Sequence, residues 1–348
     1  MSYLRNTWYV AAWDHEVSDK KPIARKILDE PLLLFRDSMG KPQAIGDRCP
    51  HRFAPLSKGC VKGDSIQCAY HGLEFDGTGQ CTRNPHGKGN IPTQAKVKSY
   101  PVIERHSIVW IWMGDSAKAY PEAIIDYSQS LDPAKRFVAK DYLHARANYQ
   151  LETDNIMDLS HIEFLHPGSL GSDAVNQAAT EVIQEGNTVF SNRLTQNERL
   201  HESLEQRYNI PEGQKVDRWL DVRWDPPANM ELWVGIAPAG TPEPRKVGKR
   251  IPFNHFFTPE TEKTAHYWFA TSYPRRMGEE GERRANEDIK YLRGPFETED
   301  LPMLEAQQNL MGDAEFWSLK PILLPGDAAA VRARRVMDQL IKQEQEAS

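Results

Sequence analysis

The stretch that decides the fold runs from Cys49 to Gly72 and reads C-P-H-R-F-A-P-L-S-K-G-C-V-K-G-D-S-I-Q-C-A-Y-H-G. It contains C-P-H-R at 49–52 and C-A-Y-H-G at 68–72, with sixteen residues between His51 and Cys68. Each motif offers one thiolate and one imidazole, and the neighbouring proline and glycine are typical of tight loops. The spacing predicts two loops that hold one metal centre through Cys49, His51, Cys68 and His71.

Mixed ligation by cysteine and histidine points to one kind of iron–sulfur cluster. A plant-type [2Fe–2S] cluster takes four Cys, whereas a Rieske cluster replaces two Cys on one iron with two His, which raises its reduction potential. A structural zinc site is the main alternative, but zinc sites more often pair like with like, as C-x₂-C followed by H-x₃₋₅-H. We therefore interpret the four residues as ligands of a Rieske [2Fe–2S] cluster. Tyr70 could direct its hydroxyl at a cluster sulfur or simply pack.

Composition bounds the class of protein. The 348 residues, 39% hydrophobic and 26% charged, suit a globular protein with two domains. A net charge of −6 argues against nucleic-acid binding. The N-terminus has no signal-peptide pattern, and the longest apolar run, at 108–113, is too short to span a bilayer. We expect a cytoplasmic protein that binds no membrane.

The cysteine count limits the route of the electrons. Besides the two in the motifs, only Cys60 and Cys81 remain, and we expect both to be buried thiols in a reducing compartment. They are too few for a plant-type ferredoxin domain, and no G-x-G-x-x-G joins a strand to a helix. Electrons must therefore come from a separate protein.

The chain divides into two predicted domains. Residues 1–116 carry short β-rich runs at 8–13, 32–35, 66–68 and 108–113 and a D-G-T-G turn at 76–79, which predict an all-β domain. A polar connection at 117–133 marks the boundary. Residues 117–348 predict an α+β domain with a helix at 149–164, strands between 180 and 273, and helices at 281–310 and 328–344.

The segment D-N-I-M-D-L-S-H-I-E-F-L-H at 154–166 is the second informative stretch. On a continuous helix Asp154, Asp158 and His161 share one face. His166 lies about 140° away from His161 on an ideal helix, so both can bind one metal only if the helix distorts or ends between them. Pro167-Gly168 makes such an end plausible.

Two histidines and one carboxylate form the ligand set that leaves open positions on Fe(II) for O₂ chemistry. The run at 297–305 offers four acids, and its spacing does not choose among them: Glu297, Glu299, Asp300 and Glu305. The alternatives are a pair of surface histidines and a solvated acidic helix face.

Together these motifs resemble the oxygenase components of Rieske non-haem iron oxygenases. The further blocks R-N-T-W-Y-V-A-A at 5–12, V-W-I-W-M-G-D at 109–115, E-D-L-P-M-L-E at 299–305 and R-R-V-M-D at 334–338 are most similar to the vanillate, dicamba and toluenesulfonate branch. The resemblance covers nearly the whole chain. It implies a helix-grip catalytic domain, in which a curved antiparallel sheet surrounds a long helix.

The resemblance also implies roles for single residues. It makes Asp300 the acid that binds mononuclear Fe(II) with His161 and His166, and it places Asn155 close to that iron. It implies that Asp158 links the cluster of one subunit to the iron of the next in a head-to-tail homotrimer.

Substrate positions by resemblance to the dicamba branch are Leu232, His255 and Tyr291. Leu232 departs from the pattern, because an amide stands there in the dicamba enzyme and an apolar side chain cannot replace its hydrogen bond. The implied reaction is O₂-dependent O-demethylation of an aromatic such as vanillate, with electrons from NADH delivered by an FMN and plant-type ferredoxin reductase. Methyl hydroxylation, N-demethylation and ring dihydroxylation stay open.

Overall fold

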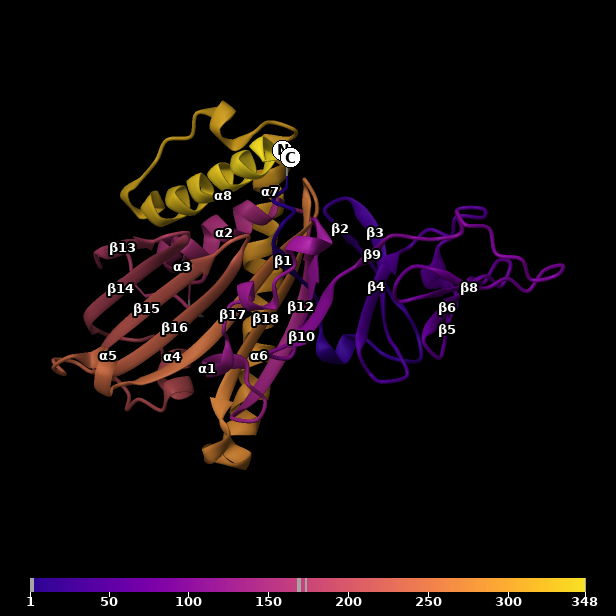
Figure 1. Ribbon diagram of the computed structural model, residues 1–348. Coiled ribbons are helices and arrows are strands. Elements are labelled where there is room, and N and C mark those ends of the chain that lie inside the picture. Colours follow the sequence, from indigo (N-terminus) through magenta and orange to yellow (C-terminus); the bar gives the residue numbers. More distant parts are fainter. Residues whose placement is uncertain (1–2, 168–169, 173, 348) are drawn as a thin grey trace. The chain divides into compact units, whose positions relative to one another are not determined.

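The computed structural model describes residues 3–167, 170–172 and 174–347 (Figure 1). The chain forms two compact units, one of Tyr3–Tyr127 with Thr258–Glu262, the other of Ser128–Phe257 with the chain from Lys263 onward. The first unit thus continues past the expected boundary at 116 as far as Tyr127.

The first unit is built of short antiparallel strands in three sheets, ordered β1-β11-β10, β2-β3-β4-β9 and β5-β6-β7-β8. The runs expected at 8–13 and 108–113 form strands because their continuous apolar residues are buried in the core. The strands are β1 Trp8–Trp13, β2 Ile23–Ile27, β3 Glu30–Arg36, β4 Pro42–Gly46, β5 Cys60–Lys62, β6 Ser65–Gln67, β7 Glu74–Asp76, β8 Cys81–Arg83, β9 Ser99–Tyr100, β10 Val102–Arg105 and β11 Ile108–Trp112.

The expected D-G-T-G turn joins β7 to β8, and the Asp76 carboxylate accepts hydrogen bonds from the backbone N–H groups of Thr78 and Gln80. The expectation that Cys60 is buried is wrong. In β5 the side chains of Cys60 and Lys62 are exposed, because alternate residues of a strand face opposite sides. Cys81 is buried as expected, and none of the four cysteines forms a disulfide.

The second unit is built on one seven-stranded sheet, ordered β12-β18-β17-β16-β15-β14-β13. Its central strands are almost fully buried, whereas the edge strand β13 is largely exposed. The expected strands at 230–236, 253–257 and 266–271 lie within it. Its members are β12 Arg136–Ala145, β13 Thr180–Glu185, β14 Thr188–Glu198, β15 Val216–Asp225, β16 Asn229–Pro238, β17 Lys249–Thr261 and β18 Thr264–Pro274.

A long helical segment packs on this sheet, as the helix-grip expectation requires. Helix α6 lies against β12 and β18, and α8 packs on α2, β13 and β14 (Figure 1). The helices are α1 Ser128–Leu131, α2 Tyr149–Met157, α3 Ile162–Leu165, α4 Glu202–Tyr208, α5 Pro244–Val247, α6 Glu279–Pro295, α7 Leu301–Met311 and α8 Ala328–Glu346. Within the described residues, none has the length and apolar character needed to cross a bilayer.

The helical stretch expected at 281–310 is present from Glu279 to Met311, but it is not a regular α-helix along its whole length. Between α6 and α7 lies η7, a π-helical turn of Phe296–Asp300. Proline has no N–H to donate to the carbonyl four residues earlier, and Pro295 and Pro302 bracket the turn, so regular α-helical bonding is interrupted on both sides of it. The π turn ends at Asp300.

Candidate functional site

The two motif loops of the first unit have the same backbone geometry. In the first, the Cys49 N–H donates to the Ala54 carbonyl and the Phe53 N–H donates to the Cys49 carbonyl. In the second, Cys68 N–H donates to Leu73 and Gly72 N–H donates to Cys68. Phe53 and Gly72 both have positive φ, at 61° and 71°. The two cysteines therefore take matching positions, whereas His51 lies two residues after its cysteine and His71 three residues after its own.

The thiols and the imidazoles lie at different depths. Cys49 and Cys68 are each 2% exposed. Burial and the neighbouring Cys68 thiol raise the pKa of Cys49. The rings of His51 and His71 lie nearer the surface with centroids 4.6 Å apart. Two buried sulfurs and two outward imidazoles suit a cluster that has one Cys-ligated and one His-ligated iron.

Two further side chains lie beside the imidazoles. Tyr70 is 64% exposed, and its ring centroid is 3.9 Å from that of His71, so it covers the His71 ring and is not part of the core. His86, which the sequence did not single out, has Nε2 2.7 Å from the His71 carbonyl oxygen. Its position depends on a loop at 84–90 for which the sequence has no motif.

In the second unit, the helix expected at 149–164 breaks at Asp158. Helix α2 ends at Met157, Asp158 is extended with φ −120° and ψ 92°, and a 3₁₀ turn, η5 Leu159–His161, leads into α3. The Asp158 side chain accepts from the Ser160 N–H and caps the new turn. The expected single face for Asp154, Asp158 and His161 is therefore wrong. Gly168, expected to help end the helix, lies outside the described residues.

The end of α3 brings His161 and His166 to one place, because the helix stops at Leu165 and His166 takes a non-helical backbone conformation. The His166 side chain follows α3, and the two ring centroids are 5.4 Å apart. Asp300 completes the group, with its Oδ1 3.5 Å from His161 Nε2 and 3.2 Å from His166 Nε2. One ligand atom from each of the three residues lies within 4.8 Å of the others. This donor set fits one metal ion held by two imidazoles and a carboxylate.

Surrounding groups orient the three side chains. His161 Nδ1 donates to the Asp158 carbonyl oxygen over 2.8 Å, and His166 Nδ1 donates to the Glu299 carboxylate, so both Nε2 atoms stay directed at Asp300. Asn155 donates from Nδ2 to Asp300 Oδ1 over 3.0 Å. Glu299 was one of four acids that spacing could not separate, and it contacts His166 from within the π turn.

The remaining acids of the motif have other partners. Asp154 forms an ion pair with Arg334 of α8, with Arg334 Nη2 2.6 Å from Asp154 Oδ2. Asp158 Oδ1 lies 3.3 Å from Arg193 Nη2. No hydrogen bond to Asp158 Oδ2 is formed within the described part of the chain, where this atom lies beside Gly326. One oxygen of Asp158 can therefore accept a further hydrogen bond.

A cavity adjoins the three potential ligands. The cavity and its solvent-filled mouth together have a volume of about 680 Å³. Most of its wall is apolar, and its lining includes Asn155, His161, His166, Asp300, Leu220, Leu232, Val234, Phe253, His255, Phe296 and Arg207. Of the expected substrate residues, Leu232 and His255 line it. Tyr291 is not among the lining residues, and its ring lies 4.5 Å beneath the Arg207 guanidinium carbon.

His255 presents an unsatisfied nitrogen. Its Nδ1 lies 2.7 Å from the Tyr267 hydroxyl, and burial lowers its pKa to about 3, so the ring is neutral. Its buried Nε2 has no hydrogen-bond partner among the described residues. If the Tyr267 hydroxyl donates to Nδ1, both groups are satisfied and Nε2 carries the proton that a ligand in the cavity can accept.

Comparison with known proteins agrees with this geometry. Residues 7–101 match the Rieske [2Fe-2S] domain, and residues 145–343 match the vanillate O-demethylase oxygenase C-terminal domain. The chain is 39% identical to the dicamba O-demethylase oxygenase component of Stenotrophomonas maltophilia, with 98% of each chain covered. It is 33% identical to a vanillate O-demethylase oxygenase subunit of Pseudomonas sp. strain HR199, covering 99% of this chain and 97% of the relative.

A solved structure shows the same fold. The crystal structure of dicamba monooxygenase bound to 3,6-dichlorosalicylic acid superposes with a TM-score of 0.90 at 36% identity, and 99% of each chain is covered. The chain is a Rieske non-haem iron oxygenase, an oxidoreductase whose cofactors are a [2Fe–2S] cluster and a mononuclear iron. Within that class it belongs to the family of oxygenase components with the vanillate O-demethylase C-terminal domain.

Proposed function

We propose that this protein removes the methyl group of an aryl methyl ether, with Cys49, His51, Cys68 and His71 holding the cluster and His161, His166 and Asp300 holding the iron. The observation that carries the proposal is the convergence of two imidazoles and one carboxylate beside a mostly apolar cavity. The demethylases among the relatives support the choice of reaction.

When bound, the cluster supplies single electrons and the iron activates O₂ for hydroxylation of a C–H bond. The chain's own residues prepare that chemistry. Asp158 and Glu299 fix the ring orientation of His161 and His166, and Asn155 fixes Asp300. The apolar wall excludes water and seats an aromatic ring, while His255 offers a polar contact. Hydroxylation of the methoxy carbon gives a hemiacetal, which collapses to a phenol and formaldehyde.

Vanillate is the first substrate to test. Dicamba is less favoured, because Leu232 lies in the cavity wall and cannot donate a hydrogen bond. The second candidate is hydroxylation of an aryl methyl group by the same machinery, which is favoured by 38% identity to the iron–sulfur subunit of the toluene-4-sulfonate monooxygenase system of Comamonas testosteroni.

With a reductase, NADH and vanillate, we expect one formaldehyde per substrate consumed. Under ¹⁸O₂ the label should enter the departing carbon, because the new bond forms there and the phenolic oxygen stays from the ether. Formaldehyde should be trapped by rapid reduction to methanol before its hydrate exchanges oxygen with water. A cis-diol product, or no formaldehyde from any methoxylated aromatic, would instead assign the protein to ring dihydroxylation or methyl hydroxylation.

The electron donor we propose is a separate reductase with FMN and a plant-type ferredoxin centre, which would draw electrons from NADH. A relative described as an oxygenase component supports a multi-component system. None of the four cysteines, all of them in the described part of the chain, forms a disulfide, which is consistent with the reducing, cytoplasmic location that we also propose.

We further propose a head-to-tail homotrimer in which Asp158 bridges two subunits. A groove beside Asp158 and His161 supports a protein partner at this place, since Ile322 and Leu323 line it. Ile322 is 90% and the adjacent Leu324 66% exposed, and exposed apolar side chains that gather at one place mark interfaces.

A closed trimer is the expected state in solution, because a head-to-tail contact that closes on itself forms a ring. Sedimentation should give about three times the chain mass of 39.7 kDa. Ile322→Glu, which places a charge in the proposed contact, should weaken the trimer, whereas Leu310→Glu on the exposed side of α7 serves as the matched control. A fully active monomer would rule out electron transfer between subunits.

A further inference from the structure

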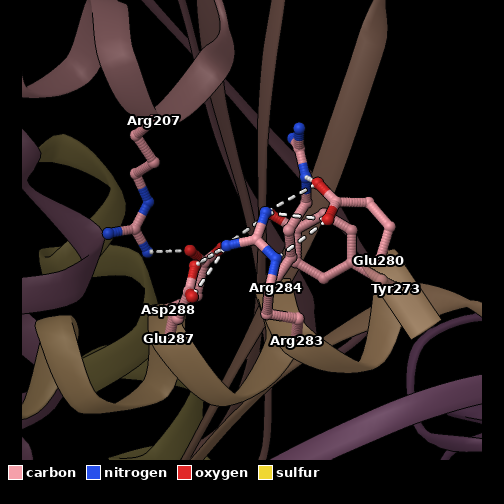
Figure 2. Close-up of polar contacts among 7 residues, drawn as sticks. All are labelled: Arg207, Tyr273, Glu280, Arg283, Arg284, Glu287 and Asp288. Atoms are coloured by element: carbon pink, nitrogen blue, oxygen red, sulfur yellow. Dashed lines mark hydrogen bonds and ion pairs between the residues drawn. The ribbon is translucent and has the colours of Figure 1, made fainter.

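Arg207 is a charged side chain on the cavity wall that the reaction described above does not use. It belongs to the last turn of α4, and its side chain is 11% exposed. Its guanidinium lies over the Tyr291 ring, and Nη2 is 3.2 Å from Asp288 Oδ1 (Figure 2). Figure 2 shows the other amino group directed away from Asp288.

The donors of this guanidinium are incompletely used. The buried Nη2 lacks a hydrogen bond of good geometry despite the ion pair, and no hydrogen bond from Nε or Nη1 is formed within the described residues. Asp288 is shared, since its Oδ2 accepts from the Tyr273 hydroxyl over 2.6 Å. A guanidinium has five N–H donors, and leaving them unpaired beside an apolar wall is costly.

The second arginine of the cavity shows the contrast. Arg218 donates from Nε and Nη2 to the two carboxylate oxygens of Glu198, over 3.1 Å and 2.7 Å, and both side chains are at most 3% exposed. Its charge is matched within the protein. Arg207, which lines the same cavity, differs from Arg218 in having guanidinium donors without a hydrogen-bond partner among the described residues.

We infer that Arg207 binds an acidic substituent of the aromatic substrate, a carboxylate or a sulfonate, and thereby selects anionic substrates. A planar fork of N–H groups pairs with two acid oxygens in one plane. Tyr291 beneath the guanidinium and Asp288 beside it hold the fork in place, so Tyr291 acts on the substrate through Arg207. Because Leu232 of β16 is apolar and cannot bind the acidic group, the residue that holds this group is Arg207 of α4.

The inference rests on the proposed function for the identity of the substrate, but its binding test does not require turnover. The probes are 4-methoxybenzoate and its neutral isostere 4-methoxybenzamide, titrated calorimetrically into the holoenzyme. Arg207→Met keeps the apolar stem and removes the donors. Arg207→Lys keeps the charge near Asp288 and removes the fork. Arg283→Met is the matched control, because Arg283 is 55% exposed and its ion-pair partners among the described residues are Glu280 and Glu287 (Figure 2).

Wild type and Arg283→Met should both prefer the acid. Arg207→Met should weaken acid binding about 10- to 100-fold, the loss expected for a charge-assisted hydrogen bond, and change amide binding less than about threefold. Arg207→Lys should bind the acid about tenfold more weakly than wild type. This variant provides the test if the methionine variant does not fold. In turnover the loss should appear in KM and not in kcat.

Two results would overturn the assignment of Arg207: no preference for the acid in wild type, or equal losses for acid and amide in both Arg207 variants. A protein that binds the acid through Arg207 but forms no formaldehyde would contradict the demethylase proposal alone. Formaldehyde formed equally well from acid and amide would contradict the role of Arg207 alone.

Discussion

Replacement of Asp300 by alanine is expected to lower turnover by at least about a thousandfold and to reduce the iron content from about three atoms per chain to about two, those of the cluster. The reason is geometric. The Asp300 carboxylate is the one acid that lies within reach of both His161 Nε2 and His166 Nε2 in the described structure. Iron analysis measures the total iron per chain, and the visible absorption of the cluster measures the part that belongs to the cluster. The difference is the mononuclear iron.

Glu297→Gln is the matched control, because Glu297 lies on the same π turn and pairs with Arg293 at the surface. It should keep wild-type iron and activity. Glu299→Gln should retain iron with reduced affinity, about 10- to 100-fold, because it orients His166 without binding the metal. If Glu299→Gln lost the iron and Asp300→Ala retained it, Glu299 would be the metal ligand and Asp300 would not.

Asp158→Asn should leave both iron pools intact and still lower turnover by at least about a hundredfold. The iron site should survive because the Asp158 backbone carbonyl, and not its side chain, holds His161. The local fold should survive as well, because asparagine caps the 3₁₀ turn as well as aspartate does. What is lost is the carboxylate that we propose to link the cluster and the iron of neighbouring subunits.

Stopped-flow spectroscopy of the pre-reduced enzyme isolates this step. On mixing with substrate and O₂, the reduced cluster should be reoxidised much more slowly in Asp158→Asn than in wild type. Glu163→Gln, a carboxylate-to-amide change in α3 of the same segment, should reoxidise at the wild-type rate. Wild-type reoxidation in Asp158→Asn would contradict the bridging role, and loss of iron would make Asp158 a ligand.

The cluster loops were predictable from sequence because each is a local structure. A cysteine and a histidine separated by one or two residues need only a tight loop to face the same side, and the loops have matching backbone hydrogen bonds. The strands at 8–13 and 108–113 were predictable for a similar reason, since continuous apolar runs are buried wherever a core exists.

The iron site was only partly predictable, because its geometry depends on two helix irregularities. Periodicity alone continues the helix through Asp158, although an aspartate followed by Leu-Ser-His can cap a new turn. The prolines at 295 and 302 were a visible signal of disturbed bonding around Asp300. Choosing Asp300 over Glu299 required the resemblance, since the two are adjacent and differ only in which way the π turn directs them.

The substrate side of the site was the least predictable, because it assembles from distant segments. Arg207 comes from α4 and Tyr291 from α6, and nothing in either local sequence marks their contact. Cys60 shows the same limit, since its exposure follows from the pairing of β5 and not from its residue type.

The π turn at Phe296–Asp300 also bears on how this segment tolerates change in length. A π turn holds one residue more than an α-helical turn, so it inserts a residue while α6 and α7 keep the faces that they bury. Deleting one residue from 296–299 should therefore restore regular α-helical pitch and leave α6 and α7 on the faces that they bury, so that only the residues within the turn are redirected. The packing of α6 and α7 can thus tolerate a one-residue change in this turn, whereas the contacts of Glu299 and Asp300 with the histidines cannot.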